Sequence, residues 1–424
     1  VLQWDKDDCA AMGIVKFDLL ALGALNGLHL SIDAIREVHG VEIDLATIPQ
    51  EPVVYDMLTR ADTVGVFQVE SRAQMATLPR MKPKTFYDLA VEVALIRPGP
   101  IQGHSVHPYL RRRNGEEPVR YPHPLTEPIL EKTLGVPIFQ EQLMELARIC
   151  AGFTAGQSDR LRQAMTHKRS DEAMGSLRDD VFAGMEANEV TGAAADEIWE
   201  KLQGFAAFGF PESHSVSFAY IVYMSSWLKY HWPTEFFMGL LNAQPMGFYS
   251  PNSLVQDAQH HGVVVLPPDI NQSWFDCTVE PLSAEEDDVA EYLGMRWRRG
   301  RGAFDDPMRT PAALRIGLRY VRNLGDAEIT RIEAARMVSG PFESAEDLAQ
   351  RTGLPVDGLE ALAAGGALVP LGIGRREGIW AAGALAGMGP DRLPLASGTE
   401  APELPSMVRY DEMQADLWST GISV

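Results

Sequence analysis

A lysine and an aspartate stand two residues apart in an apolar run near the start of the sequence. The run is GIVKFDLLAL, residues 13–22, and its charged residues are Lys16 and Asp18. Alternate residues of a strand point to the same face, so a strand over residues 13–18 would present both side chains together. A carboxylate beside a lysine suits a metal ion bound to phosphate oxygens, because Mg²⁺ prefers oxygen ligands. The alternative is a plain Lys–Asp ion pair at a strand edge.

Further basic residues stand at the ends of predicted helices. Arg97 precedes a Pro-Gly-Pro turn, and a guanidinium at a rigid turn suits bidentate recognition of phosphate. Arg162 and Lys168 stand on and just beyond another helix, where they could hold a triphosphate. The alternatives are a solvated arginine at a helix C-terminus, where the dipole favours a cation, and an ordinary exposed basic helix end.

Ser213 and His214 stand at the start of a helix predicted over residues 215–230. Backbone N–H groups and the helix dipole favour an anion at such a place. A Ser–His pair without an acid partner is a poor nucleophile signature, so hydrolysis is not predicted here. Helical spacing predicts that four apolar residues of this helix face a core: Val216, Tyr220, Tyr223 and Trp227.

Residues 318–332 predict a helix, a tight turn and a second helix. Such hairpins present backbone N–H groups and nearby arginines to DNA phosphates, which positions a duplex without reading its sequence. The candidate contacts are Arg322, Asn323, Gly325 and Arg331. A second hairpin is predicted over residues 359–368. The alternative is an ordinary α-hairpin in a helical bundle.

The hydrophobic pattern predicts a mainly α protein, with short strands at its edges. Two β-like segments are expected besides residues 13–18, over 62–68 and 275–279. Residues 101–137 are expected to be loop-rich because they contain six prolines, and residues 283–311 to form an exposed insertion. The predicted helices cover residues 29–39, 55–58, 83–96, 141–151, 157–165, 170–188, 191–205, 215–230 and 411–418.

Composition bounds the possible classes of protein. The chain has 424 residues and a formal charge of −21, which argues against general nucleic-acid binding, although the basic patches at 111–113 and 296–301 can act locally. No apolar run reaches the length of a membrane span, and the three cysteines show no metal or disulfide spacing, as in a reducing cytoplasm. Without an N-terminal Met or signal peptide, the sequence is expected to be a fragment.

Taken in order, these motifs resemble those of the bacterial C-family DNA polymerases, whose members are similar to the polymerase III alpha subunit. The resemblance extends to about residue 380. Pro211 and Glu212 stand where replicative relatives carry Asn-Lys, so the error-prone, damage-tolerant branch is the more similar one. The segments that carry the resemblance are GIVKFDLLAL, GVFQVESRAQM, ALIRPGP, LGVPIFQEQLM, FGFPESHSVSFA and LPPDIN.

The resemblance implies an aspartate triad in a polymerase palm. Asp18 matches the third aspartate, which with the other two would bind two Mg²⁺ ions, and Lys16 matches the lysine that faces the incoming nucleotide. The first two aspartates are absent from this sequence, so we expect the 424 residues alone to be inactive. The residues that would line the dNTP pocket are Arg97, Arg162, Lys168, Ser213 and His214.

The resemblance also implies an order of domains: the end of an α/β palm, a large helical fingers domain and a helix–hairpin–helix unit. The expected divisions are 1–25 for the last part of the palm, 26–275 for the fingers, 276–311 for a β-like segment and exposed loop, 312–380 for the DNA-binding unit, and 381–424 for a linker and the start of the following region. A PHP domain, a thumb and the first part of the palm are absent from the sequence.

The implied activity is template-directed, error-prone DNA synthesis in the cytoplasm during repair of DNA damage, with primer–template DNA and dNTP as partners. Gln414 to Trp418 is similar to a sliding-clamp-binding peptide, and the resemblance suggests the clamp or accessory mutagenesis proteins as further partners. The alternative for this segment is a packed helix. The alternative for the chain is a non-catalytic DNA-binding or scaffold protein that retains the fingers fold.

Overall fold

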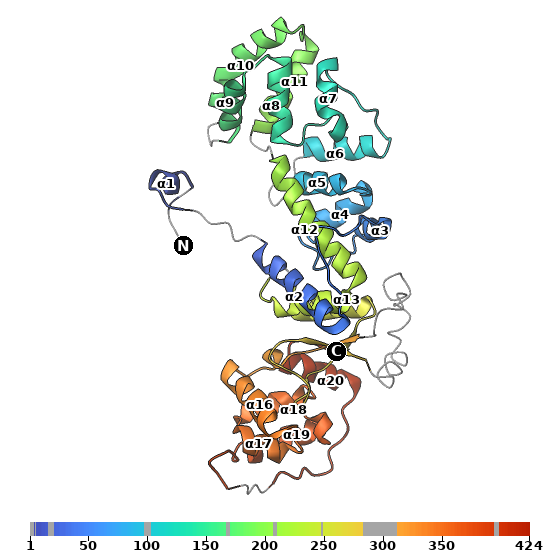
Figure 1. Ribbon diagram of the computed structural model, residues 1–424, viewed down its shortest axis with the longest axis vertical. Coiled ribbons are helices and arrows are strands. Elements are labelled where there is room, and N and C mark those ends of the chain that lie inside the picture. Colours follow the sequence, from blue (N-terminus) through green and yellow to red (C-terminus); the bar gives the residue numbers. More distant parts are fainter. Residues whose placement is uncertain are drawn as a thin grey trace. The chain divides into compact units, whose positions relative to one another are not determined.

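Helices make up most of the structure, which is a computed structural model (Figure 1). The described residues are 4, 6–15, 21–96, 103–166, 170–206, 210–246, 249–282, 312–393 and 398–424. The chain forms two compact units: Val1–Asp44 together with Leu228–Val424, and Leu45–Trp227. The mainly α class predicted from the hydrophobic pattern is confirmed.

The unit formed by residues 45–227 is helical throughout its described part. Two apolar clusters form its core, one around α8 to α11 and the other around α5, α6 and residues 136–139. Its helices are α3 (Pro52–Thr59), α4 (Arg72–Met81), α5 (Phe86–Leu95), α6 (Gly103–Arg113), α7 (Glu127–Leu130), α8 (Gln140–Cys150), α9 (Ala155–Thr166), α10 (Ser170–Ala187), α11 (Ala193–Ala206) and most of α12 (Glu212–His231).

Helix α6 corrects the prediction that residues 101–137 are loop-rich. Pro108 lies inside this helix, where it removes one backbone hydrogen bond. Val106, Tyr109 and Leu110 are nevertheless buried, and their spacing places them on one helical face. Burial of this apolar face offsets the free energy that the proline costs the helix.

The strand predicted over residues 62–68 is also wrong, because these residues form turns. Gly65 and Gln68 have φ values of 74° and 68°, in the left-handed region that a strand cannot contain. The core stripe predicted on α12 is only partly buried. Tyr223 is buried, whereas Val216 and Tyr220 are exposed, and the Tyr220 hydroxyl donates to the Leu45 carbonyl.

In the other unit, α2 (Leu22–His39) packs on α13 (Pro233–Asn242). The two backbones approach closely, since a Cβ added at Gly239 would lie 2.3 Å from the Gly27 carbonyl oxygen. His39 and Glu235 form a buried pair at 2.7 Å between the same helices. The helix predicted over residues 29–39 is confirmed as the latter part of α2.

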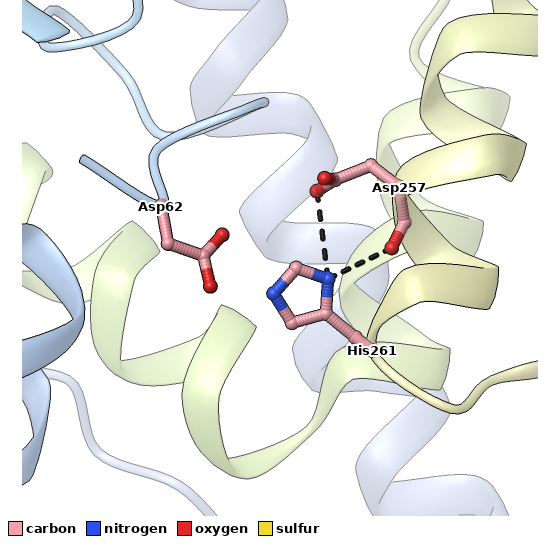
Figure 2. A group of neighbouring side chains, drawn as sticks. All are labelled: Asp62, Asp257 and His261. Carbon is pink, nitrogen blue, oxygen red and sulfur yellow. Dashed lines mark hydrogen bonds and ion pairs between the residues drawn. The ribbon is translucent and has the colours of Figure 1, made fainter. Parts of the chain in front are cut away.

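A buried lysine anchors the end of α12 to α14 (Pro251–His260). The fully buried Lys229 ammonium lies 2.8 Å from an Asp257 carboxylate oxygen. The His261 ring lies beside the same residue, with Nδ1 2.8 Å from the Asp257 carbonyl oxygen (Figure 2). Loss of the Asp257 carboxylate would leave a buried cation unpaired, which is strongly destabilising.

Three short strands follow, in the order β1 (Val264–Leu266), β3 (Ala312–Arg315), β2 (Thr278–Pro281). Strand β3 pairs in parallel with β1 and antiparallel with β2. The sequence predicts a β-like segment over residues 275–279. Strand β2 begins at Thr278, so it confirms only the end of that segment. The insertion predicted over residues 283–311 lies outside the described residues.

The helices after the sheet share one apolar core, which extends from Ile270 to Met388. They are α16 (Asp326–Ser339), α17 (Ala345–Thr352), α18 (Val356–Ala364) and α19 (Arg375–Leu385), followed by α20 (Arg409–Ser419). Near the start of the chain lies α1 (Lys6–Ala11). Residues 13–15 are not in a strand, contrary to prediction, and residues 16–18 lie outside the described part.

Glu92 of α5 is a buried carboxyl group without a hydrogen-bond partner for either oxygen among the described residues. Burial raises its pKa to about 8, an effect that the nearby Arg113 partly opposes. The folded state therefore binds a proton that the unfolded state releases above its ordinary pKa. The contribution of Glu92 to stability is largest below the ordinary pKa of a glutamate and falls as the pH rises toward the folded-state value.

We expect Glu92→Gln to remove this pH dependence. The wild-type chain should lose up to ~1 kcal/mol of stability per pH unit relative to the variant between about pH 5 and about pH 8. Thermal melting of both proteins across this range measures the difference. Glu200→Gln, a change of an exposed glutamate in the same unit, is the control. A difference that stays constant with pH would contradict the prediction.

Candidate nucleic-acid interface

The first predicted hairpin is present, but it does not begin with a full helix. Leu318–Tyr320 forms a single 3-10 turn rather than the predicted helix, and α16 begins at Asp326, directly after Gly325. Asn323 has a φ of 62° in the turn, a conformation that asparagine tolerates better than most residues. Arg322, Asn323 and Gly325 are exposed. These three residues of the turn therefore lie at the surface.

The second hairpin lies later in the chain than the predicted residues 359–368. Those residues form the end of α18 and the turn after it, and α19 begins only at Arg375. The turn before α19 is Gly372-Ile373-Gly374, in which Gly372 has a φ of 80°. The missed sequence signal is two glycines one residue apart, followed directly by two arginines. This pair of helices, α18 and α19, completes a second helix–hairpin–helix.

The two hairpins share one capping arrangement. Gly325 precedes α16 and its N–H donates to the Glu328 carboxylate at 3.1 Å, while Gly374 precedes α19 and its N–H donates to Glu377 at 3.0 Å. Each N–H is thus already bonded to a carboxylate of its own helix, at the place where the sequence predicts a phosphate contact.

The arginines of the hairpins bind acidic residues of the same unit. Arg331 pairs with Glu328 at 2.9 Å, and its side chain is half exposed. Arg375 binds the Asp416 carboxylate at 2.5 Å and the Ala364 carbonyl at 2.9 Å. Arg376 binds Asp411 at 3.0 Å.

Asp411 and Asp416 both belong to α20, so this helix holds the two arginines that open α19. Burial raises the pKa of the Asp416 carboxyl, although the hydrogen bond from Arg375 acts in the opposite direction. The second hairpin is therefore joined to α20 by an ion pair whose acidic member, Asp416, is largely buried.

Ser213 and His214 lie in the first turn of α12, as predicted, and both are exposed. The His214 ring packs between Phe210 and Phe218, with ring centroids 5.2 Å and 4.2 Å away. The Ser213 carbonyl accepts a hydrogen bond from the Ser217 hydroxyl. A role of either side chain toward a nucleotide stays a prediction.

Carboxylates already occupy the start of α12. The Glu212 N–H donates to a Glu141 carboxylate oxygen at 2.9 Å. The Glu212 side chain pairs with Lys132 at 2.6 Å and accepts from the Tyr87 hydroxyl at 2.8 Å. Burial raises the pKa of Tyr87, and the bond to Glu212 adds to this effect. An anionic ligand here would compete with Glu141.

The remaining predicted catalytic and nucleotide-binding residues have no described side chains. Lys16, Asp18, Arg97 and Lys168 lie outside the described residues. Arg162 lies in α9, and only the backbone of this residue is described. The position of these five side chains relative to Ser213 and His214 therefore lies outside the described structure, and their roles stay predictions.

The three arginines of the basic patch at residues 111–113 form ion pairs and hydrogen bonds with groups of their own unit. Arg111 and Arg112 both pair with Glu117, and Arg113 pairs with Asp88 at 2.6 Å. Arg113 also donates to the Met81 and Lys82 carbonyls. This patch is structural. The patch at 296–301 lies outside the described residues.

The segment similar to a clamp-binding peptide is helical. It lies within α20, where Asp416 is buried and Gln414, Leu417 and Trp418 are exposed. This agrees with a packed helix, and clamp binding stays a prediction. None of the described helices is both long and apolar enough to cross a membrane.

Comparison with known families agrees with these elements. Residues 24–189 match the bacterial DNA polymerase III alpha subunit finger domain, and residues 262–378 match a helix–hairpin–helix motif. The chain therefore carries a polymerase III alpha subunit finger domain and a helix–hairpin–helix motif, which confirms the resemblance drawn from its motifs.

The individual relatives that match this chain are error-prone DNA polymerases. The chain is 54% identical over its whole length to the error-prone DNA polymerase of Mycolicibacterium paratuberculosis and 53% identical to that of Mycobacterium tuberculosis. It is 52% identical to the error-prone DNA polymerase of Corynebacterium jeikeium. The chain spans only about a third of these proteins, covering 36% of the first two and 37% of the third.

We expect Glu328→Gln and Glu377→Gln to strengthen binding of duplex DNA. Each change keeps a hydrogen-bond acceptor near the hairpin N–H and removes a negative charge from the place where a phosphate would lie. Affinity for a short labelled duplex should rise roughly two- to fivefold for each variant at low salt, and the gain should shrink as salt is added. Fluorescence anisotropy measures both effects.

The matched control for these variants is Glu360→Gln on α18, away from either capping position. An equal gain in this control would mean that overall charge, rather than the hairpin turns, controls binding. Unchanged affinity in both hairpin variants would remove the turns from the DNA interface.

Proposed function

We propose that this chain forms the fingers and a duplex-gripping part of an error-prone DNA polymerase. The activity is template-directed transfer of a nucleotidyl group from a dNTP to a primer 3′ hydroxyl, in the cytoplasm, during synthesis across damaged DNA. The observation that carries the proposal is the identity of at least 52% over the whole chain with three proteins named error-prone DNA polymerase.

In this proposal the two hairpins bind the sugar–phosphate backbone of the primer–template duplex. Hairpin turns contact phosphates through backbone N–H groups and arginines, so binding does not depend on base sequence. The exposed turn at Arg322 and Asn323 and the Gly372-Ile373-Gly374 turn have this form. Such binding suits a polymerase, which must move along any template.

Asp18 is the residue of this chain that we propose for metal binding. Its carboxylate is the oxygen donor that Mg²⁺ prefers, and two such ions would neutralise charge as the phosphoryl group is transferred. Lys16 would face the incoming dNTP, with Arg97, Arg162, Lys168, Ser213 and His214 along the nucleotide pocket. These residues position the triphosphate, and positioning is the main contribution of a protein to this reaction.

The rival is a non-catalytic DNA-binding protein that keeps the finger and hairpin regions. It shares every contact with duplex DNA and differs at Asp18, which would then carry no metal. Further partners, including a sliding clamp at Gln414 to Trp418 or accessory mutagenesis proteins, are compatible with either reading of the chain.

A chimeric polymerase distinguishes the catalytic proposal from the non-catalytic rival. We expect the Mycobacterium tuberculosis polymerase, with its matching region replaced by this chain, to extend a primer with dNTPs and Mg²⁺. Asp18→Asn in the chimera should reduce extension to background, because a metal ligand is lost, while duplex binding persists. Gel assays of extension and anisotropy with the same duplex measure the two properties.

Asp8→Asn, at an exposed aspartate of α1, is the control for this experiment and should extend normally. Near-normal extension by Asp18→Asn would refute the assignment of the metal ligand. A folded chimera that binds duplex but does not extend it would favour the non-catalytic rival.

A further inference from the structure

The last turn of α20 contacts both hairpins. The Arg322 backbone N–H donates to the Ser419 carbonyl at 2.7 Å, which joins α20 to the first hairpin. The Arg375 guanidinium binds Asp416 at 2.5 Å, which joins α20 to the second. Ser419 is fully buried and Asp416 is 8% exposed, so this turn is fixed on the side that faces the hairpins.

Trp418 lies between these two anchors, and its ring is beneath the Arg322 side chain. The guanidinium carbon is 5.5 Å from the centre of the indole ring, within the range of a cation–π contact. Arg322 is exposed, and Trp418 is 44% exposed, so both groups remain open to a ligand.

A cation–π contact acts on the charge of a guanidinium and does not need its N–H groups as donors. The Trp418 ring can therefore restrain the long Arg322 side chain while its N–H groups stay available to a phosphate. Restraint before binding lowers the conformational entropy that an arginine loses when it contacts a phosphate.

We propose that Trp418 is a positioning residue for duplex DNA, which holds the Arg322 guanidinium in place for a backbone phosphate at the first hairpin. The proposal rests on the proposed function, in that the hairpin must bind duplex. It makes α20, a helix outside the two hairpins, a second contributor to DNA binding. Trp418 acts through Arg322 and does not itself need to touch DNA.

Four variants of the full chain test this: Arg322→Ala, Trp418→Leu, Trp418→Phe, and Arg322→Ala combined with Trp418→Leu. Both replacements at Trp418 keep apolar bulk, and only phenylalanine keeps a ring face. Affinity for a labelled primer–template duplex is measured by anisotropy over a series of salt concentrations, and melting temperatures check that each variant is folded.

We expect Arg322→Ala to weaken binding roughly three- to tenfold and to lower the salt slope by about one, as for one lost phosphate contact. Trp418→Leu should weaken binding roughly two- to fivefold, and Trp418→Phe should keep most of the wild-type affinity. The double variant should bind no more weakly than Arg322→Ala alone, because Trp418 has no effect without the arginine.

Leu417→Ala is the matched control. Leu417 precedes Trp418 on α20 and is 41% exposed against 44% for Trp418. It should leave duplex affinity unchanged. Equal weakening by Leu417→Ala and Trp418→Leu would mean that a disturbed α20, rather than the ring, lowers affinity, which would overturn the proposal.

The remaining outcomes separate this inference from the proposed function. If Arg322→Ala binds duplex as the wild type does, DNA binding by the first hairpin is refuted and the positioning role fails with it. If Arg322→Ala weakens binding and Trp418→Leu does not, only the positioning role fails. If the two changes weaken binding additively, Trp418 contacts DNA directly and the role assigned here is wrong.

Discussion

The ion pair between Arg375 and Asp416 is the contact on which the arrangement of the hairpin unit depends. It closes α20 onto the start of α19 at 2.5 Å, and burial of Asp416 makes the pair costly to break from one side. Because the Ser419 carbonyl of α20 also accepts the Arg322 N–H, this helix connects the two hairpin turns.

The capping of the two hairpin helices, α16 and α19, is the second constraint. Glu328 and Glu377 satisfy N–H groups that would otherwise be unpaired at the start of α16 and α19, which stabilises each helix. If the hairpins bind DNA as proposed, the same carboxylates would oppose a phosphate at the same donors, so capping would stabilise the unbound chain at the expense of affinity for DNA.

Most of the helical structure could be predicted from the sequence, because periodic apolar residues carry that signal over long segments such as α2, α8 and α10. The errors came from residues whose conformation depends on packing. Gly65 and Gln68 adopt left-handed φ values where an apolar run predicted a strand, and α6 forms around Pro108 because three of its residues are buried. Local propensity does not contain these contacts.

The hairpin turns of the candidate interface could be predicted from the sequence in type but not in position. Asn323 was a sound prediction because the turn needs a residue that tolerates positive φ, and that property belongs to the residue itself. The Gly372-Ile373-Gly374 turn was missed because the earlier pair Gly365-Gly366 carries the same local signal. Trp418 could not be linked to Arg322 from sequence at all, since the contact joins residues 96 positions apart through a backbone bond at Ser419. Trp418, which the sequence suggests as part of a clamp peptide, thus contacts Arg322 within the chain, and a partner of α20 could bind only the face that the hairpins leave exposed.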